Sequence, residues 1–98
     1  MEKKEKIIEV LKKVIDPELH IDVWTLGLIY NIEIKKDLVE IRMTFTSPMC
    51  PYGPFLVDDI KNKLKEAHKW IKEVKIEVVF QPLWEPSEEL KAMLGIPI

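Results

Sequence analysis

The spacing of apolar residues changes period several times along this chain, and the order of these changes limits the folds that it can adopt. Near the start, four apolar residues follow the spacing of one face of a helix: Ile7, Val10, Leu11 and Val14. The Asp16-Pro17 pair should end this helix, because a residue that precedes proline is disfavoured in the helical region. The chain is therefore expected to begin with an amphipathic helix.

From residue 30 the period becomes two, which is the spacing of a strand with one buried face. Two successive runs alternate apolar with polar residues: Tyr30, Ile32 and Ile34, then Val39, Ile41, Met43 and Phe45. The polar pair Lys36-Asp37 separates the two runs and is typical of a turn. This segment is predicted to form a β-hairpin.

A second helix, a third strand and a short last helix follow in the sequence. Pro54 suits the first turn of a helix, where its missing N–H costs nothing. Helical spacing then continues in Leu56, Ile60, Leu64, Ala67 and Ile71. The third strand has apolar residues on one face: Val74, Ile76, Val78 and Phe80. Ser87 should cap a last helix that runs through Leu94 and stops at Gly95.

The resulting element order, α-β-β-α-β-α, predicts a fold of the α+β class. A three-stranded sheet with one apolar face can be covered by two amphipathic helices, which gives a two-layer α/β sandwich. The helical crossover should leave the third strand parallel to the second, so the sheet is expected to be mixed. A chain of 98 residues has the length of one domain, and residues 1–98 are expected to share a single core.

Charge and hydropathy argue against two classes of partner. Fifteen basic and seventeen acidic residues give a formal net charge of -2, whereas wrapping a nucleic-acid backbone needs a basic surplus. No apolar run approaches the ~20 residues of a membrane span, and no signal-peptide core follows Met1. We therefore expect a cytoplasmic protein that binds neither nucleic acid nor membrane. Its richness in Lys, Glu and Ile favours a heat-adapted, thermophile source.

Cys50 is the one cysteine of the chain and lies in a proline-flanked loop between the predicted second strand and second helix. A single cysteine excludes an internal disulfide and a closed four-thiolate metal site, which fits a reducing compartment. A position just before a helix exposes a thiol to backbone N–H groups and the helix dipole, which favour the thiolate. Cys50 is therefore either a metal-binding or reactive thiolate, or an inert buried cysteine.

A turn from Asp16 to Asp22 contains three carboxylates, including that of Glu18, together with His20. One interpretation is a polar turn between a helix and a strand. The other is that these groups line the same end of the sheet as Cys50 and act as metal ligands, proton acceptors or hydrogen-bond anchors. The residue types alone leave both interpretations open.

Two further positions stand out in the loops. Gly27 is predicted to take a positive φ, or to allow a close backbone approach, where the chain enters the hairpin. Trp84 lies between Pro82 and Pro86 and is a candidate interface residue, because exposed aromatic side chains often mark protein interfaces.

Four blocks of sequence occur in an order that is similar to one known family. They are Asp16-Pro17-Glu18, then Ile21-Asp22-Val23 with Leu26-Gly27-Leu28-Ile29-Tyr30, then Met43-Thr-Phe-Thr-Ser-Pro-Met-Cys-Pro51, then Pro82-Leu-Trp84. The chain resembles the PaaD-like/SufT family of the iron–sulfur cluster assembly (FSCA) domain superfamily over residues 7–94. The resemblance implies an α-β-β-α-β core. It places the family's reactive cysteine at Cys50, its acidic turn at Asp16 and Glu18, and its hydroxyl-bearing loop at Thr46 and Ser47.

The resemblance also implies a function, namely that of an accessory factor in iron–sulfur cluster assembly or maturation rather than an enzyme. Cys50 would then be a thiolate ligand or transient carrier site for iron or a cluster shared between subunits, with the acidic turn and the hydroxyl-bearing loop in support. The expected partners are an iron–sulfur scaffold, a P-loop ATPase carrier, apo client proteins or a second copy of the chain in a homodimer.

Two alternatives remain at this point. The chain could be a metal-free adaptor that docks partners through the Trp84 loop, as the related PaaD proteins accompany a multicomponent oxygenase. It could also be a thiol enzyme with Cys50 as nucleophile and His20 as base. The enzyme hypothesis is the weaker one, because the chain is short for a deep substrate pocket and no motif supplies an oxyanion hole.

Overall fold

The computed structural model describes residues 2–46, 52–81 and 84–94. Its helices are α1 (Glu2–Leu11), α2 (Gly53–Ala67) and α3 (Glu88–Leu94). Its strands are β1 (Ile29–Lys35), β2 (Leu38–Met43) and β3 (Glu73–Val78). The predicted order of elements is therefore confirmed.

The three strands form one mixed sheet in the order β1-β2-β3. β1 and β2 are antiparallel and form the predicted hairpin, whereas β3 is parallel to β2 and is reached through α2. The hairpin register shifts between Ile29 and Asn31, so Tyr30 is an extra residue in β1. Apart from this irregularity, the sheet has the topology that the sequence predicts.

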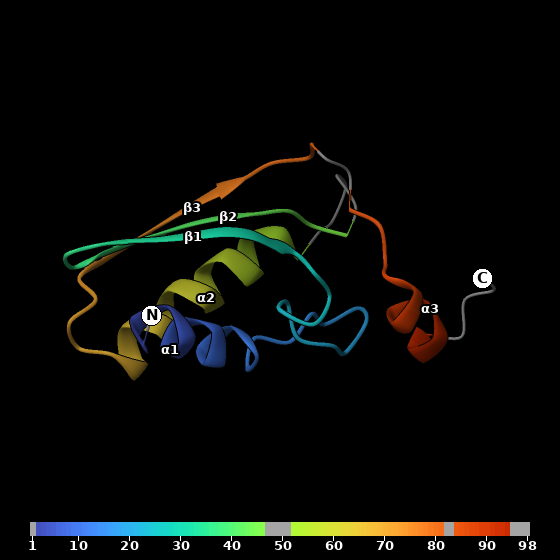
Figure 1. Ribbon diagram of the computed structural model, residues 1–98, viewed down its shortest axis with the longest axis horizontal. Helices are drawn as coiled ribbons and strands as arrows, with labels where there is room; N and C mark the ends of the chain where they lie inside the picture. Colours follow the sequence, from blue (N-terminus) through green and yellow to red (C-terminus); the bar gives the residue numbers. More distant parts are fainter. Residues whose placement is uncertain (1, 47–51, 82–83, 95–98) are drawn as a thin grey trace.

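Both α1 and α2 lie on the same face of the sheet, as Figure 1 shows. The side chains buried between the two layers are aliphatic residues or Met, and they include Ile7, Leu11, Ile32, Val39, Ile41, Met43, Leu56, Ile60, Leu64 and Val74. Burial of such side chains stabilises a fold by roughly 1.5–3 kcal/mol each. The structure is therefore the two-layer α+β sandwich expected from the apolar spacing.

The first helix is shorter than the sequence suggests, since α1 ends at Leu11 and not at the Asp16-Pro17 pair. After Leu11 the chain tightens, and the N–H of Val14 bonds to the Leu11 carbonyl three residues earlier at 3.1 Å. The Val14 carbonyl in turn accepts the N–H of Val23 at 2.9 Å. Residues 13–15 thus form a turn that pairs with the following loop and not a further turn of helix, although their apolar spacing is helical.

The last helix forms where it was predicted. The N–H of Leu90 donates to the Ser87 hydroxyl at 3.1 Å, which is the expected N-terminal cap. Leu90 itself is buried and joins the main core. The predicted stop at Gly95 lies outside the described residues. In the part of the chain that the structure describes, no helix has the length and hydropathy of a membrane span.

Candidate functional site

The acidic turn after α1 is organised by the carboxylate of Asp16, which is 1% exposed. Its Oδ1 accepts hydrogen bonds from the backbone N–H groups of Glu18 at 2.7 Å and Leu19 at 3.0 Å. The Asp16 carbonyl accepts the N–H of His20 at 2.8 Å. Aspartate bonded to N–H groups two and three residues later is an Asx-type turn. The carboxylate of Asp16 thus holds the turn together from inside.

Glu18 and His20 are the exposed members of this turn. His20 takes a φ of +59°, the left-handed conformation that lets the chain reverse at this point. Among the described residues, neither side chain forms a hydrogen bond or an ion pair. Of the two carboxylates predicted to belong to the site, Glu18 is therefore the one that a ligand can reach.

A second turn, from Asp22 to Leu28, leads the chain into β1. The Asp22 carboxylate accepts the N–H of Thr25 at 2.9 Å and caps the start of the turn. Gly27 has a φ of +75°, which confirms the predicted positive φ. The N–H of Leu28 then reaches back to the Val23 carbonyl at 3.1 Å, the bond that ends a helical turn at a glycine.

Trp84 ties the segment before α3 to this second turn. Its indole Nε1 donates to the Leu26 carbonyl, and the half-buried ring packs against the core. Nε1 lies 4.0 Å from the position that a Cβ at Gly27 would occupy. The indole N–H is therefore used inside the molecule, and a contact between Trp84 and a partner protein stays a prediction.

The two turns meet the end of β2. Directly after that strand, the N–H of Thr44 donates to the Leu28 carbonyl at 2.8 Å, and Thr44 is fully buried. Figure 1 shows the loop of residues 12–28, the end of β2 and the segment of residues 84–94 at one end of the molecule. The structure thus brings the acidic turn and the start of the hydroxyl-bearing loop to the same end of the sheet.

The loop between β2 and α2 begins and ends at residues that touch each other. The Phe45 ring lies so close to Gly53 that a Cβ on this glycine would stand 2.5 Å from the ring Cε2. The same ring makes an edge-to-face contact with Phe80, with 6.1 Å between centroids. The Phe45 ring therefore fixes the point at which the chain leaves the sheet and the point at which it re-enters as α2.

The start of α2 has an uncompensated positive end. Its N-cap residue, Tyr52, forms no side-chain capping bond, and its first turn has no acidic residue. Pro54 in that turn has no N–H to donate. In sequence, Cys50 precedes the first residue of this helix by three positions. An anion near the helix start would be favoured by the free N–H groups and the helix dipole.

Two predicted site residues, Cys50 and Ser47, lie outside the described residues, so the structure tests neither. Thr46 is half-buried and is the last described residue before them. Within the described ranges, no hydrogen bond joins Thr46 to the acidic turn, and no group of three or more His, Cys, Asp or Glu could hold a metal ion. The described residues therefore supply the acidic turn, the end of β2 and the start of α2, but not a complete set of metal ligands.

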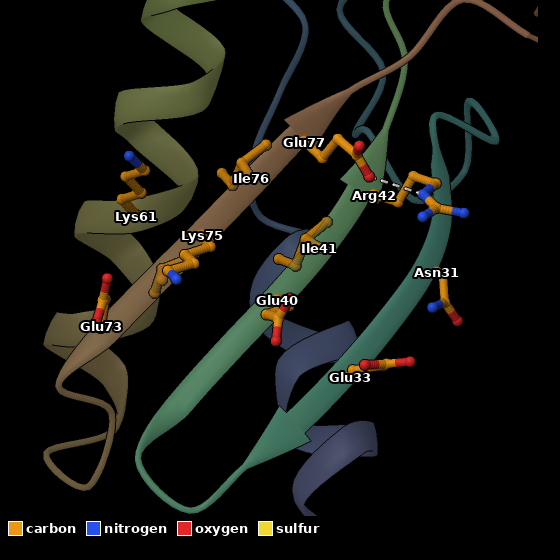
Figure 2. Close-up of a pocket in the computed structure, with 11 residues that line it drawn as sticks. Asn31, Glu33, Glu40, Ile41, Arg42, Lys61, Glu73, Lys75, Ile76 and Glu77 are labelled. Carbon is orange, nitrogen blue, oxygen red and sulfur yellow. Dashed lines mark hydrogen bonds and ion pairs between the residues drawn. The ribbon is translucent and has the colours of Figure 1, made fainter.

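A shallow hollow with different chemistry lies on the outer face of the sheet, opposite the helices (Figure 2). Within the hollow, Arg42 Nε donates to Glu77 Oε1 at 3.0 Å. Glu40, another lining residue, lies 3.2 Å from the ammonium of Lys35, which is beside the hollow rather than in its lining. The hydrogen bond and the negative charge of Glu40, helped by Glu33, raise the pKa of Lys35 above its ordinary value. The hollow is an exposed sheet face on which charges of both signs alternate.

Sequence reasoning missed the structural importance of Gly53 and of Asp22. The need for glycine at position 53 comes from a ring eight residues earlier, a contact that no local pattern reveals. Asp22 could have been identified from the sequence, because an aspartate at the start of a turn often accepts the backbone N–H of the third residue after it, as it does here from Thr25. Its spacing to Gly27 would have indicated a capped turn.

The sequence is similar to a known protein family over most of its length. A family model described as iron-sulfur cluster assembly protein matches residues 4–78. The chain is 39% identical to an Fe-S protein maturation auxiliary factor of Porphyromonas gingivalis, over 97% of this chain and 93% of that protein. It is 38% identical to the Fe-S protein maturation auxiliary factor YitW of Bacillus subtilis, over 95% and 94% of the two chains.

The fold is also similar to a solved structure. The crystal structure of a Bacillus anthracis domain of unknown function, DUF59, superposes with a TM-score of 0.84. The two sequences are 35% identical, and the match covers 95% of this chain and 92% of the other. Similarity in sequence and similarity in shape therefore extend over the same elements, including both sides of the loop between β2 and α2.

Proposed function

This chain belongs to the iron–sulfur cluster assembly protein family, and we propose that it is an accessory factor in the maturation of iron–sulfur proteins. The observation that carries the proposal is the nearly full-length similarity to relatives that are named Fe-S protein maturation auxiliary factors. This similarity spans the whole α+β sandwich rather than one short motif, so it supports a shared role for the whole chain.

In this proposal, Cys50 is a thiolate ligand or a transient carrier site for iron or an iron–sulfur cluster, which is the cargo of the protein. Metals bind the thiolate and not the thiol, and a positive helix end favours the thiolate. The start of α2, three positions after Cys50 in sequence, has neither a side-chain cap nor an acidic residue in its first turn. These features support a thiolate at the adjacent loop.

One thiolate cannot hold a cluster alone, so the remaining ligands must come from another molecule or from non-cysteine side chains. We propose a second copy of this chain, an iron–sulfur scaffold, a P-loop ATPase carrier or an apo client as the source. A cluster held by ligands from two molecules is released when the two separate, which suits transfer better than storage. The accessible carboxylate of Glu18 and the hydroxyls of Thr46 and Ser47 would assist such a shared site, and Asp16 would hold Glu18 in place.

Anaerobic reconstitution tests the role of Cys50. The protein and its Cys50→Ser variant are incubated with iron and sulfide, and visible absorbance is recorded after desalting. We expect the wild type to acquire sulfur-to-iron charge-transfer bands and the variant to lose them. Ser47→Ala, in the same loop, removes only an assisting hydroxyl and should weaken the bands without abolishing them. Identical spectra for the wild type and Cys50→Ser would contradict the ligand role.

Transfer of the cargo is tested separately. The loaded protein is mixed with an apo-ferredoxin, and the gain of the ferredoxin spectrum is followed in the presence of a chelator that captures free iron. We expect transfer from the wild type and none from Cys50→Ser. A loaded protein that never donates its cluster would contradict the accessory role while leaving the ligand role intact.

We further propose that the chain is not an enzyme and acts in the cytoplasm.

The metal-free adaptor hypothesis differs from the metal-carrying role in one measurable respect, because an adaptor needs its docking surface and not its thiol. A pull-down of partners with Trp84→Phe and Cys50→Ser separates the two. Trp84→Phe also removes the bond to the Leu26 carbonyl, so its free energy of unfolding is measured beside the pull-down. Loss of partners in Trp84→Phe alone, beyond the fraction of this variant that is unfolded, would favour the adaptor.

A further inference from the structure

The end of the molecule that is opposite the candidate site carries a concentration of lysines. Segments 2–6, 35–37 and 65–73 contain eight lysines and five acidic residues, whereas the rest of the chain has seven basic and twelve acidic residues. We call this surface the lysine end and define it by Lys3, Lys4, Lys6, Lys35, Lys36, Lys65, Lys69 and Lys72. Figure 1 shows the start of α1, the β1–β2 turn and the α2–β3 connection together at this end.

Contacts between the three segments make the lysine end one continuous surface. The backbone N–H groups of Lys72 and Glu73 donate to the Asp37 carbonyl at 2.9 and 3.2 Å, which joins the α2–β3 connection to the hairpin turn. The Lys3 ammonium lies 4.6 Å from the centre of the Trp70 ring, which joins the start of α1 to the same connection. Lysines that are far apart in sequence are thereby held close in space.

These lysines are exposed and mostly without partners. All eight are solvent-exposed, and among the described residues Lys35 is the one member of the set that forms ion pairs. Elsewhere in the described chain, two of the seven basic residues form ion pairs, Arg42 with Glu77 and Lys63 with Asp59, so what marks the lysine end is its local excess of lysine over acidic residues. Eight lysines against five acidic residues leave a surplus of three positive charges, and the positive field of this surplus attracts an acidic surface and raises its association rate.

We propose that the lysine end is a docking surface for a partner protein that presents carboxylates. The cationic side chains of the lysine end are all lysine, a flexible point charge that pairs with carboxylates without a fixed geometry. A partner bound here would lie away from the acidic turn and leave the loop between β2 and α2 accessible. This surface does not involve Cys50, so the proposal goes beyond the metal-carrying role.

Two other anionic partners fit this surface less well. Nucleic acid presents a dense row of phosphates and often stacks its bases on aromatic rings, but five acidic residues are interspersed among the lysines and Lys3 covers the Trp70 ring. A membrane surface is held best when apolar side chains accompany the lysines. The exposed large apolar residues of the described chain all lie outside the three segments: Ile15, Tyr52, Phe55 and Met93.

The test uses poly-L-glutamate as the carboxylate probe and the ¹⁵N-labelled full chain as the observed molecule. At low ionic strength we expect amide shifts confined to segments 3–6, 35–37 and 65–73, which disappear at high salt. The triple change K36E/K69E/K72E should weaken binding about tenfold, because it reverses three charges of the docking surface. The matched triple change K12E/K13E/K91E alters net charge equally at other positions and should leave affinity within about twofold.

Several outcomes would overturn the proposal. Equal weakening by both triple changes, with both variants folded by circular dichroism, would mean that binding follows net charge and not the lysine end. Tighter binding to a DNA duplex or to phosphatidylserine vesicles at the same ionic strength would assign the surface to phosphate. Self-association at low salt that K36E/K69E/K72E abolishes would assign it to a second copy. Cys50→Ser should bind the probe like the wild type, so this test can fail independently of the metal-carrying role.

Discussion

The two ends of this molecule use their polar groups in opposite ways. At the end with the acidic turn, Asp16 and Asp22 accept backbone N–H groups, and the Trp84 indole donates to a backbone carbonyl. At the lysine end, the charged groups extend into solvent, and all but Lys35 lack an ion pair within the described chain. Substitutions should therefore change stability at the first end and binding at the second.

Removing the Asp16 carboxylate should give the largest effect and tests the first half of this contrast. Asp16→Ala leaves two N–H groups of the turn without their buried acceptor, which should lower the free energy of unfolding by about 2–3 kcal/mol. The neighbouring change Glu18→Ala removes an exposed carboxylate and should stay within about 0.5 kcal/mol. Urea denaturation of both variants measures the difference, and equal losses would show that Asp16 does not organise the turn.

A side chain at Gly53 should have the next largest effect. Gly53→Ala places a Cβ against the Phe45 ring, and overpacking of this kind costs roughly 1–3 kcal/mol. Because the obstacle is the ring itself, combining Gly53→Ala with Phe45→Leu should recover part of the loss. A double-mutant cycle on thermal unfolding measures this coupling. Strictly additive losses would mean that the ring and the helix start do not constrain each other.

Neutral substitutions at the lysine end should slightly raise the free energy of unfolding, whereas the two preceding substitutions lower it. The double change Lys69→Gln and Lys72→Gln removes like-charge repulsion and should raise the free energy of unfolding by up to about 0.5 kcal/mol at low salt. The gain should vanish in high salt, because exposed charges are then screened. A clear loss of stability in this double variant would show that Lys69 or Lys72 makes a stabilising contact within the protein. That result would contradict the difference between the two ends.

Lys35 should show the smallest effect, and it sharpens the comparison because it is the paired lysine of that end. Its hydrogen bond to Glu40 raises the pKa, so the folded state holds this proton more tightly than the unfolded state does. The stabilising contribution is present below the unfolded-state pKa and is lost as the pH rises through the folded-state value. A ¹³C NMR titration of Lys35 should show its pKa fall when Glu40 is changed to Gln, and an unchanged pKa would contradict the role of this pair.

The hairpin and α2 could be predicted from sequence because their apolar spacing and their burial coincide, as in Val39, Ile41 and Met43. The end of α1 could not be predicted. Val14 keeps helical spacing, yet its carbonyl bonds to Val23 in a loop whose position depends on the finished fold. Local spacing identifies an element but does not reveal where a tertiary hydrogen bond interrupts it.

The candidate site was harder to predict than the fold for the same reason. A carboxylate that organises a turn and one that binds a ligand look alike in sequence, so the role of Asp16 became apparent only from its burial and its two donors. Gly53 depends on a ring that approaches it from the end of β2. Cys50 and Ser47 lie outside the described residues, and their roles remain predictions that rest on the family resemblance.

The hydrogen bond from the Trp84 indole to the Leu26 carbonyl joins residues 58 positions apart. It therefore bears on where this chain can be truncated. The family model ends at residue 78, and a chain cut there would keep all three strands and both covering helices. It would nevertheless lose the donor that secures the glycine turn before the hairpin. A fragment that ends at residue 78 is therefore expected to fold but to lose the native arrangement of the turn before the hairpin. A truncation that keeps this turn must extend at least through Trp84.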